Sequence, residues 1–232
     1  MAGRPPTPDG LDDKVPFLAR LDHDARATLL ALGTETRYPA RSAVLREGED
    51  STHVLLIMNG WLKVTSSSGT GYEALLALRG PGDIVGETSA VNSAPRSATV
   101  TTLEPVRALS IRESAFTSFL SEQPQAALQL LRLMTGRLAA GDRKRLEYAS
   151  CTVRQRLARL LLELAASHGE QVPDGTAIRV PLTRSEIAGS VGASREAVTR
   201  LLGELRDRQV VVTRGRVLIV RQPDKLRQVG AG

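Results

Sequence analysis

The spacing of hydrophobic positions changes along this chain of 232 residues. Residues 16–32 have a short helical pattern, whereas residues 36–111 consist of short apolar and β-branched runs separated by glycines. In HVLLIMNGWLKVT, two such runs flank the pair Asn59-Gly60, which is typical of a tight β-hairpin turn. Many short strands at this spacing predict a small antiparallel barrel or jelly roll.

A long helical pattern follows over residues 124–150, where positions of one kind recur every three or four residues. Its first half presents Leu128, Leu131, Thr135 and Leu138 as a single stripe. Such a stripe is compatible with packing against the helix's own domain. It is equally compatible with a short parallel coiled coil between two subunits, and both arrangements can hold at once.

A third pattern begins near residue 152. The stretch VRQRLARLLLELAASHG predicts an amphipathic helix that ends at Gly169. A loop over residues 170–176 and a strand over residues 178–182 are expected next. Near the end of the chain, VVVTRGRVLIV predicts two strands about Arg214-Gly215, which would form a wing.

Between these elements lies LTRSEIAGSVGASREAVTRLLGEL, which contains two helix starts and one helix stop. Thr183 and Glu186 have the Thr-x-x-Glu spacing of a capping box. Gly192 can make the turn that ends the first helix, and Ser194 can cap the second. Two short helices joined by a short turn with a glycine are a helix-turn-helix.

The second of these helices carries a polar arc. At about 100° per residue from Arg195, the side chains of Thr199, Glu196 and Arg200 fall at roughly 40°, 100° and 140°. An arginine can donate two hydrogen bonds to guanine, and a glutamate can accept one from cytosine. A solvated charged face is the ordinary alternative, but the glycine turn, the capping box and the wing favour a helix that reads DNA.

Composition agrees with a polyanionic partner, since the formal net charge is +6 and the isoelectric point about 10.1. The single cysteine, Cys151, excludes a disulfide framework within one chain and favours a reducing compartment. Whether Cys151 is a small hydrophobe or a redox group stays open. Prolines stand where a signal peptide needs an apolar core, and no apolar run approaches a membrane span. We therefore expect a soluble, cytoplasmic protein with no membrane partner.

Other chemistries have little support. His23, His53 and His168 are widely spaced and show no metal-ligand pattern. Ser114 and the serines at residues 66–68 have no base partner at a recognisable spacing, and no phosphate-binding glycine loop is present. We expect neither a metal site nor an enzyme.

The helix-turn-helix stretch resembles that of the Crp/Fnr family of transcription regulators. GPGDIVGETSAVNSAPRSATV is similar to the phosphate-binding cassette of cyclic-nucleotide-binding domains, and the two occur in the family's order. The resemblance implies an α+β fold, with an N-terminal cyclic-nucleotide-binding β-barrel (jelly roll), a long dimerisation helix and a C-terminal winged helix-turn-helix. It also implies a homodimer that binds palindromic DNA with TGTGA-like half-sites and contacts RNA polymerase.

The expected domain organisation has five parts. They are a disordered N-terminal segment over residues 1–15, the barrel over residues 16–123, the dimerisation helix over residues 124–150, the winged helix-turn-helix over residues 151–222 and a flexible tail over residues 223–232. The expected DNA-binding residues are Arg195, Glu196, Thr199, Arg200, Thr183 and Ser194. The expected dimerisation residues are Leu128, Leu131, Thr135 and Leu138.

The cassette suggests an effector pocket. Gly86 lets the backbone approach a ligand, and Arg96 offers a fork of donors that suits a cyclic phosphate. The resemblance implies that Glu87 holds the ribose while Arg96 and Ser97 hold the phosphate. The full expected set is Gly86, Glu87, Thr88, Arg96, Ser97 and Asp142.

The base-binding positions depart from the family's pattern. Cyclic-AMP-responsive members place a threonine and then a serine or asparagine where this chain has Gly141 and Asp142. Gly141 has no side chain to offer, and an ionised Asp142 accepts hydrogen bonds but donates none. We expect no obligatory cofactor and a cyclic nucleotide, cyclic AMP first, as the effector.

Three alternatives remain open at this point. The first is an empty barrel in which Glu87 and Arg96 form a salt bridge. The second is a regulator of the same type that binds DNA without any cyclic nucleotide. The third, from another class, is an interaction or enzymatic barrel that does not bind DNA.

Overall fold

The computed structural model describes residues 15–67, 73–215 and 217–231. The expected disorder of residues 1–14 therefore lies outside the described residues. Contacts divide the chain into two units. The first is built from residues 1–66 and 76–140, and the second from residues 67–75 and 141–232. Each unit is considered by itself.

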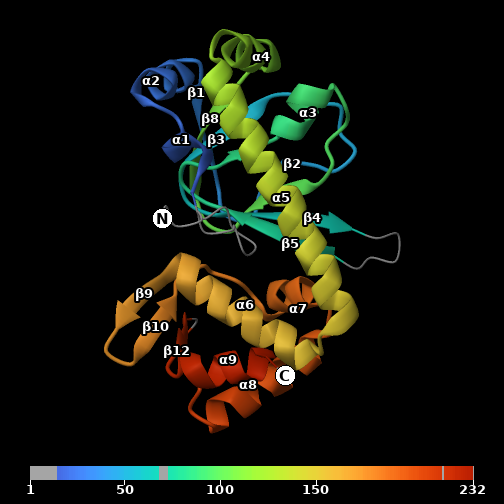
Figure 1. Ribbon diagram of the computed structural model, residues 1–232, viewed down its shortest axis with the longest axis vertical. Helices are drawn as coiled ribbons and strands as arrows, with labels where there is room; N and C mark the ends of the chain where they lie inside the picture. Colours follow the sequence, from blue (N-terminus) through green and yellow to red (C-terminus); the bar gives the residue numbers. More distant parts are fainter. Residues whose placement is uncertain (1–14, 68–72, 216, 232) are drawn as a thin grey trace, which may run out of the picture. The chain divides into compact units, whose positions relative to one another are not determined.

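Two four-stranded sheets form the centre of the first unit, with strand orders β1-β8-β3-β6 and β2-β7-β4-β5. They are open sheets of a jelly-roll type rather than a closed barrel (Figure 1). The strands are β1 (Thr34–Tyr38), β2 (Ala43–Leu45), β3 (Val54–Asn59), β4 (Leu62–Ser67), β5 (Glu73–Arg79), β6 (Ile84–Val85), β7 (Thr99–Thr102) and β8 (Val106–Ile111).

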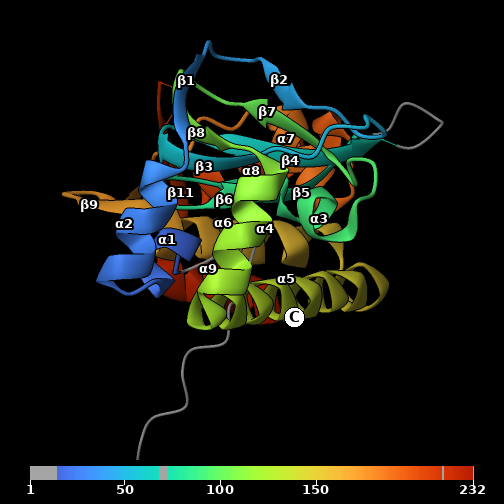
Figure 2. The same ribbon diagram turned by 90° about the horizontal axis from the view of Figure 1, so that it is seen from above.

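Strand β3 is buried on both faces, because successive side chains of a strand point to opposite sides. Leu55 and Ile57 join a cluster with residues of both sheets, such as Leu62 and Val100. Val54 and Leu56 join a second cluster that the helices of this unit complete. Those helices are α1 (Phe17–Arg20), α2 (His23–Ala31), α4 (Glu113–Glu122) and the first turns of α5 (Pro124–Ser150), which lie on one side of the two sheets (Figure 2), and Ala90 of α3 (Glu87–Asn92) joins the same cluster.

The expected hairpin across Asn59-Gly60 is wrong. Strand β3 pairs with β6 and β8, whereas β4 pairs with β7, so the turn leads from one sheet to the other. Gly60 has φ +87°, and a Cβ there would lie 2.6 Å from the carbonyl oxygen of Pro105. The Asn-Gly pair does form a turn, as expected. The strands that pair with β3 are decided by the packing of both of its faces and not by this turn.

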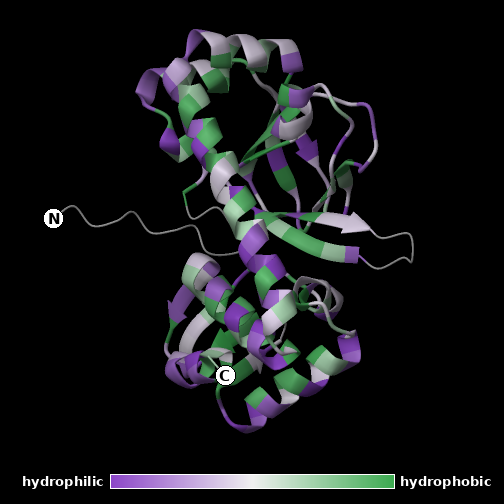
Figure 3. Cartoon of the chain, turned by 45° about the vertical axis from the view of Figure 1, so that its right-hand side comes forward, coloured by the Kyte–Doolittle hydropathy of each residue, from purple (hydrophilic) through white to green (hydrophobic). Residues whose placement is uncertain are grey.

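The second unit contains α6 (Val153–His168), α7 (Arg184–Val191), α8 (Arg195–Asp207) and a four-stranded sheet of order β11-β12-β10-β9. The wing is formed by β11 (Val211–Arg214) and β12 (Val217–Val220), which pair antiparallel as expected. The expected loop over residues 170–176 instead contains β9 (Gly169–Val172) and the start of β10 (Gly175–Ile178). Hydrophobic and hydrophilic residues alternate along its helices (Figure 3).

The expected flexible tail is also wrong, because the chain forms helix α9 (Pro223–Ala231) there. Leu226 is fully buried, and Gly230 is buried beside α6. The Arg159 guanidinium, on α6, donates a hydrogen bond of 2.9 Å to the Gly230 carbonyl oxygen. The apolar positions Leu226 and Val229 share one face of a helix at a spacing of three, a signal too short to stand out in so polar a stretch.

Helix α9 should therefore contribute to stability. We expect Leu226→Ala to lower the free energy of unfolding by about 2–5 kcal/mol, the usual cost of truncating a buried leucine. Urea titration followed by circular dichroism measures this change. Arg227→Ala, on the exposed face of the same helix, should change it by less than about 0.5 kcal/mol. Equal stability of Leu226→Ala and the wild type would contradict the packing of α9.

Candidate nucleic-acid interface and effector site

The ends of the two helices of the helix-turn-helix are fixed by the residues that the sequence predicted. The Thr183 hydroxyl accepts from the Glu186 amide at 3.2 Å, and the Glu186 carboxylate accepts from the Thr183 amide at 2.6 Å. Gly192 ends α7 with φ +61°, in the left-handed region. Ser194 caps α8 by accepting from the Ala197 amide at 3.1 Å. The predicted capping box, turn and N-cap are confirmed.

Helix α8 has one buried and one exposed face. Its buried side chains are Val198, Leu201, Leu202 and Leu205. The opposite face is formed by the exposed residues Arg195, Glu196, Thr199 and Arg200. A charged arc that begins at the first turn of such a helix is arranged as in helices that enter the major groove.

A cationic pair that the sequence analysis missed lies at the start of α7. Burial lowers the pKa of Arg184, and the nearby Arg206 guanidinium lowers that pKa further. Arg206 belongs to α8, 22 positions along the chain, so sequence spacing gave no sign that the two cations approach each other. An anion such as a DNA phosphate would relieve their repulsion.

The turn of the helix-turn-helix is held by the preceding helices. The Tyr148 hydroxyl, from the last turns of α5, donates to the Ser190 carbonyl oxygen at 2.9 Å. The Arg156 guanidinium, from α6, donates to the Val191 carbonyl oxygen at 2.8 Å and lies 5.2 Å from the centre of the Tyr148 ring. These donors satisfy carbonyl groups that the end of α7 leaves without helical partners.

In the first unit, Gly86 precedes helix α3 (Glu87–Asn92) with φ +85°. A Cβ at this position would lie 2.6 Å from a guanidinium nitrogen of Arg96 and 2.9 Å from the His53 carbonyl oxygen. The absence of a side chain therefore allows both the turn and the close approach of Arg96.

Arg96 is only 3% exposed. Its guanidinium donates to Ser51 Oγ at 2.9 Å, to the Gly86 carbonyl oxygen at 2.9 Å and to the His53 carbonyl oxygen at 2.7 Å. All three acceptors are uncharged. Burial lowers the pKa of Arg96, while the more distant charges of Glu87 and Glu49 raise it. A buried cation held by neutral acceptors offers a strong site for an anion.

Glu87 is paired with Arg137 of α5, at 2.6 Å, and both side chains are largely buried. Arg137 also donates to the Ile84 carbonyl oxygen at 3.1 Å. The salt bridge between Glu87 and Arg96 that the empty-barrel alternative required is therefore replaced by this pair. Arg137 was missed, although it continues the buried stripe of Leu130 and Leu133 at a helical spacing.

The remaining predicted effector residues are less closely joined. The Thr88 hydroxyl lies 3.4 Å from a carboxylate oxygen of Glu87. Ser97 is exposed next to Arg96. Asp142 is exposed, forms an ion pair with Arg145 and belongs to the second unit. Within the first unit, the structure thus joins Gly86, Glu87 and Arg96 into one site.

The predicted dimerisation stripe lies on a different face of α5 from the one that packs against the first unit. Ala126, Leu130 and Leu133 are buried, whereas Leu131 is 61% exposed and Leu138 65% exposed. Leu128 and Thr135 are exposed as well. One face of the helix therefore packs against its own domain, while a second, mostly apolar stripe stays exposed to solvent.

Comparison with known proteins identifies the two domains and the family. Residues 35–123 match the cyclic nucleotide-binding domain, and residues 155–229 match the Crp-like helix-turn-helix domain. A CRP-like cAMP-activated global transcriptional regulator of Mycobacterium tuberculosis is 34% identical over 82% of this chain and 84% of its own length. The chain belongs to the CRP-like transcriptional regulators.

Two solved structures show how widely this fold is shared. FixK2 of Bradyrhizobium japonicum is 21% identical and aligns with 86% of this chain and 98% of its own, with a TM-score of 0.77. The c-di-GMP responsive regulator CLP of Xanthomonas campestris is 24% identical over 86% of this chain and 99% of its own, with a TM-score of 0.74. The expected α+β architecture is confirmed. Membership of a family of DNA-binding transcription regulators also confirms that the protein is not an enzyme.

Within the described residues, no group of three or more histidine, cysteine or acidic side chains is placed to hold a metal ion. No helix there is both long and apolar enough to cross a membrane. Cys151 is partly exposed at the junction of α5 and α6.

Proposed function

We propose that this CRP-like regulator is a homodimer that reads palindromic DNA with TGTGA-like half-sites and responds to a cyclic-nucleotide effector bound in its first unit. The observation that carries the DNA-reading part is the exposed arc of Arg195, Glu196, Thr199 and Arg200 on a helix whose other face is buried. The domain boundaries at residues 123 and 150, and a contact with RNA polymerase, belong to the same proposal and rest on the family resemblance.

Base reading and phosphate contact fall to different side chains. Arg195 and Arg200 can each donate two hydrogen bonds to a guanine, and Glu196 can accept from a cytosine. Thr183 and Ser194 fix the starts of α7 and α8, whose N-terminal amides favour phosphate. Arg184 and Arg206 add positive charge that would attract the DNA phosphates whatever the base sequence.

The test of base reading is Arg195→Ala. We expect the affinity for a palindromic TGTGA probe to fall by about 1–3 kcal/mol, with relaxed preference at one base pair of each half-site. Random-site selection and fluorescence anisotropy at fixed salt measure both effects. Arg227→Ala removes the same charge from α9 and should leave the selected consensus unchanged. Selection of an asymmetric or unrelated consensus by the wild type would contradict the proposed site.

Dimerisation is supported by the exposed stripe of Leu128, Leu131, Thr135 and Leu138. A symmetric reader suits a palindromic site, and an isologous contact along α5 would bring the same leucines of two chains together. Such large apolar side chains gain stability when they leave water.

We expect the double variant Leu131→Asp with Leu138→Asp to be monomeric, because the interface would bury like charges. Light scattering measures the mass, and anisotropy should show loss of palindrome binding. Leu146 is also exposed on α5 but lies outside the proposed seam, so Leu146→Asp is the matched control and should stay dimeric. A wild type that is monomeric at micromolar concentration, with and without DNA, would refute the dimer.

The effector part of the proposal is carried by Arg96. Its buried guanidinium faces only neutral acceptors within hydrogen-bond distance in the described part of the chain, and Glu87 lies near it for a ribose hydroxyl. The Mycobacterium tuberculosis relative is named cAMP-activated, which favours a cyclic nucleotide. Gly141 and Asp142 weaken the expected contact with the base. We therefore expect modest affinity and altered selection between cyclic AMP and cyclic GMP.

Calorimetry with both nucleotides tests this. Arg96→Gln should abolish binding because the phosphate loses its charged partner, whereas the exposed Arg46→Gln should bind like the wild type. A Cβ at Gly141 meets no atom within 4 Å, so Gly141→Thr fits. Combined with Asp142→Ser, it should tighten cyclic AMP binding by about tenfold or more.

Two results would count against the effector proposal. Tight, adenine-selective binding by the wild type would show that residues 141 and 142 are misassigned. No binding of either nucleotide at millimolar concentration would favour the alternative, a regulator that binds DNA independently of cyclic nucleotides.

A further inference from the structure

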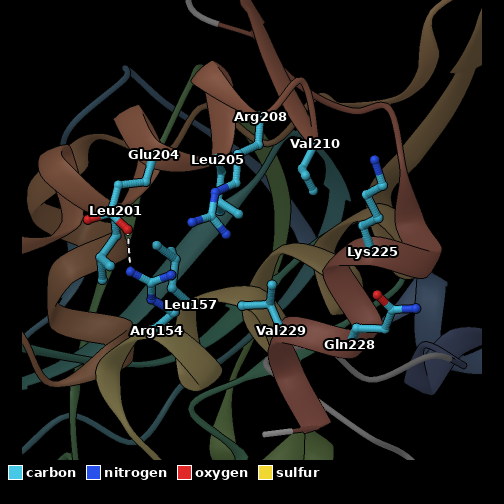
Figure 4. Close-up of a pocket in the computed structure, with 10 residues that line it drawn as sticks. All are labelled: Arg154, Leu157, Leu201, Glu204, Leu205, Arg208, Val210, Lys225, Gln228 and Val229. Atoms are coloured by element: carbon cyan, nitrogen blue, oxygen red, sulfur yellow. Dashed lines mark hydrogen bonds and ion pairs between the residues drawn. The ribbon is translucent and has the colours of Figure 1, made fainter.

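The second unit contains a hollow away from the base-reading arc. It has a volume of about 580 Å³ and lies among α6, α8 and α9 (Figure 4). Its lining residues are Arg154, Leu157, Leu201, Glu204, Leu205, Arg208, Val210, Lys225, Gln228 and Val229. Helix α9, where a flexible tail was expected, closes one side of it.

The inner wall of the hollow is apolar. Leu157 of α6, Leu201 and Leu205 of α8, and Val210 after α8 are buried, and Val229 of α9 is half-buried. Sites for small organic molecules in proteins commonly measure about 300–1,000 Å³ and combine an apolar wall with a few polar groups. The hollow has both properties.

The rim of the hollow is positively charged. It carries three cations, Arg154, Arg208 and Lys225, against one carboxylate, Glu204. Arg154 is paired with Glu204 (Figure 4, dashed line). Arg208 and Lys225 have no ion-pair partner among the residues that the structure describes. This excess of positive charge favours binding of an anionic ligand.

We propose that the hollow binds an acidic amphiphile, a small molecule with an apolar chain or ring system and a carboxylate. The apolar body would contact Leu157, Leu205 and Val229, and the carboxylate would face Arg208 and Lys225. A hollow bounded by three helices suits a compact molecule better than a helical peptide, which needs a longer groove.

Occupancy of this site would act on DNA reading through Glu204. Its carboxylate is shared between Arg154 on the rim and Arg200 on the base-reading arc, at 3.0 Å from the latter. A ligand carboxylate that faces Arg208 and Lys225 would lie on the same rim as Arg154 and compete with Glu204 for that guanidinium. Glu204 would then pair more strongly with Arg200, and Arg200 would be less free to bind a guanine. Ligand and DNA should therefore weaken each other's binding to the same extent. This coupling rests on the proposed role of Arg200, whereas the binding site does not.

Calorimetry on the full chain tests the site, with decanoate as the probe below its micelle-forming concentration and decanol as its uncharged counterpart. Decanoate should bind about tenfold or more tightly than decanol, since a charge-assisted hydrogen bond separates them. Lys225→Gln should weaken decanoate binding by a similar factor. Arg227→Gln, which removes a cation from the other face of α9, should leave it unchanged.

Val229→Trp fills the hollow and should abolish decanoate binding, with circular dichroism as the check on folding. Decanoate should also raise the Kd for palindromic DNA in the wild type but not in this variant. Equal affinities for decanoate and decanol, or decanoate binding that Lys225→Gln leaves unchanged, would overturn the inference. So would uptake of an acidic helical peptide in place of decanoate. Any of these results with intact DNA binding would leave the proposed function standing.

Discussion

The ion pair between Arg137 and Glu87 joins the long helix α5 to the segment that carries the proposed effector site. Glu87 follows Gly86, whose carbonyl oxygen holds the Arg96 guanidinium, so the pair and the anion site share one short stretch of chain. Burying a charge is costly unless it is paired and hydrogen-bonded, and Arg137 meets this need from a helix 50 positions further along the chain. A structural change at Glu87 would therefore affect α5 through this buried ion pair, and breaking the pair would cost free energy because it would leave a buried charge without a partner.

Helix α5 serves three purposes with three sets of residues. Leu130, Leu133 and Arg137 contact the first unit, and Leu131 and Leu138 stay exposed on another face. Ten residues after Leu138, Tyr148 holds the turn of the helix-turn-helix. The division between the units falls at Gly141. Helix α5 contains a second glycine, Gly136, and each glycine lowers helix stability by about 1 kcal/mol relative to alanine. The intrinsic helix propensity is therefore reduced close to the division between the units.

Local signals in the sequence were sufficient for the helix-turn-helix. Thr183, Glu186, Gly192 and Ser194 act on amides and carbonyls within a few positions, and the chemistry of such caps depends little on the rest of the fold. The burial of one arc of α8 and exposure of the other followed from helical periodicity alone.

The failures concern contacts between distant parts of the chain. The partners of β3 are chosen by burial on two faces, which a turn signal at Asn59-Gly60 does not encode. The partner of Glu87 comes from another element, and the folding of residues 223–231 depends on a surface that α6 supplies. The Glu204 carboxylate forms ion pairs with both Arg154 and Arg200, and the pair with Arg154 likewise requires that α6 and α8 are packed together.

The environment of Arg96 has a consequence for how an effector would be felt. Its guanidinium donates to Ser51 Oγ and to the carbonyl oxygens of Gly86 and His53. A guanidinium has five N–H groups, so two stay available to an anion while these three contacts hold the side chain in place. The side chain is therefore ordered before any anion arrives, and binding would not have to bear the entropic cost of immobilising it.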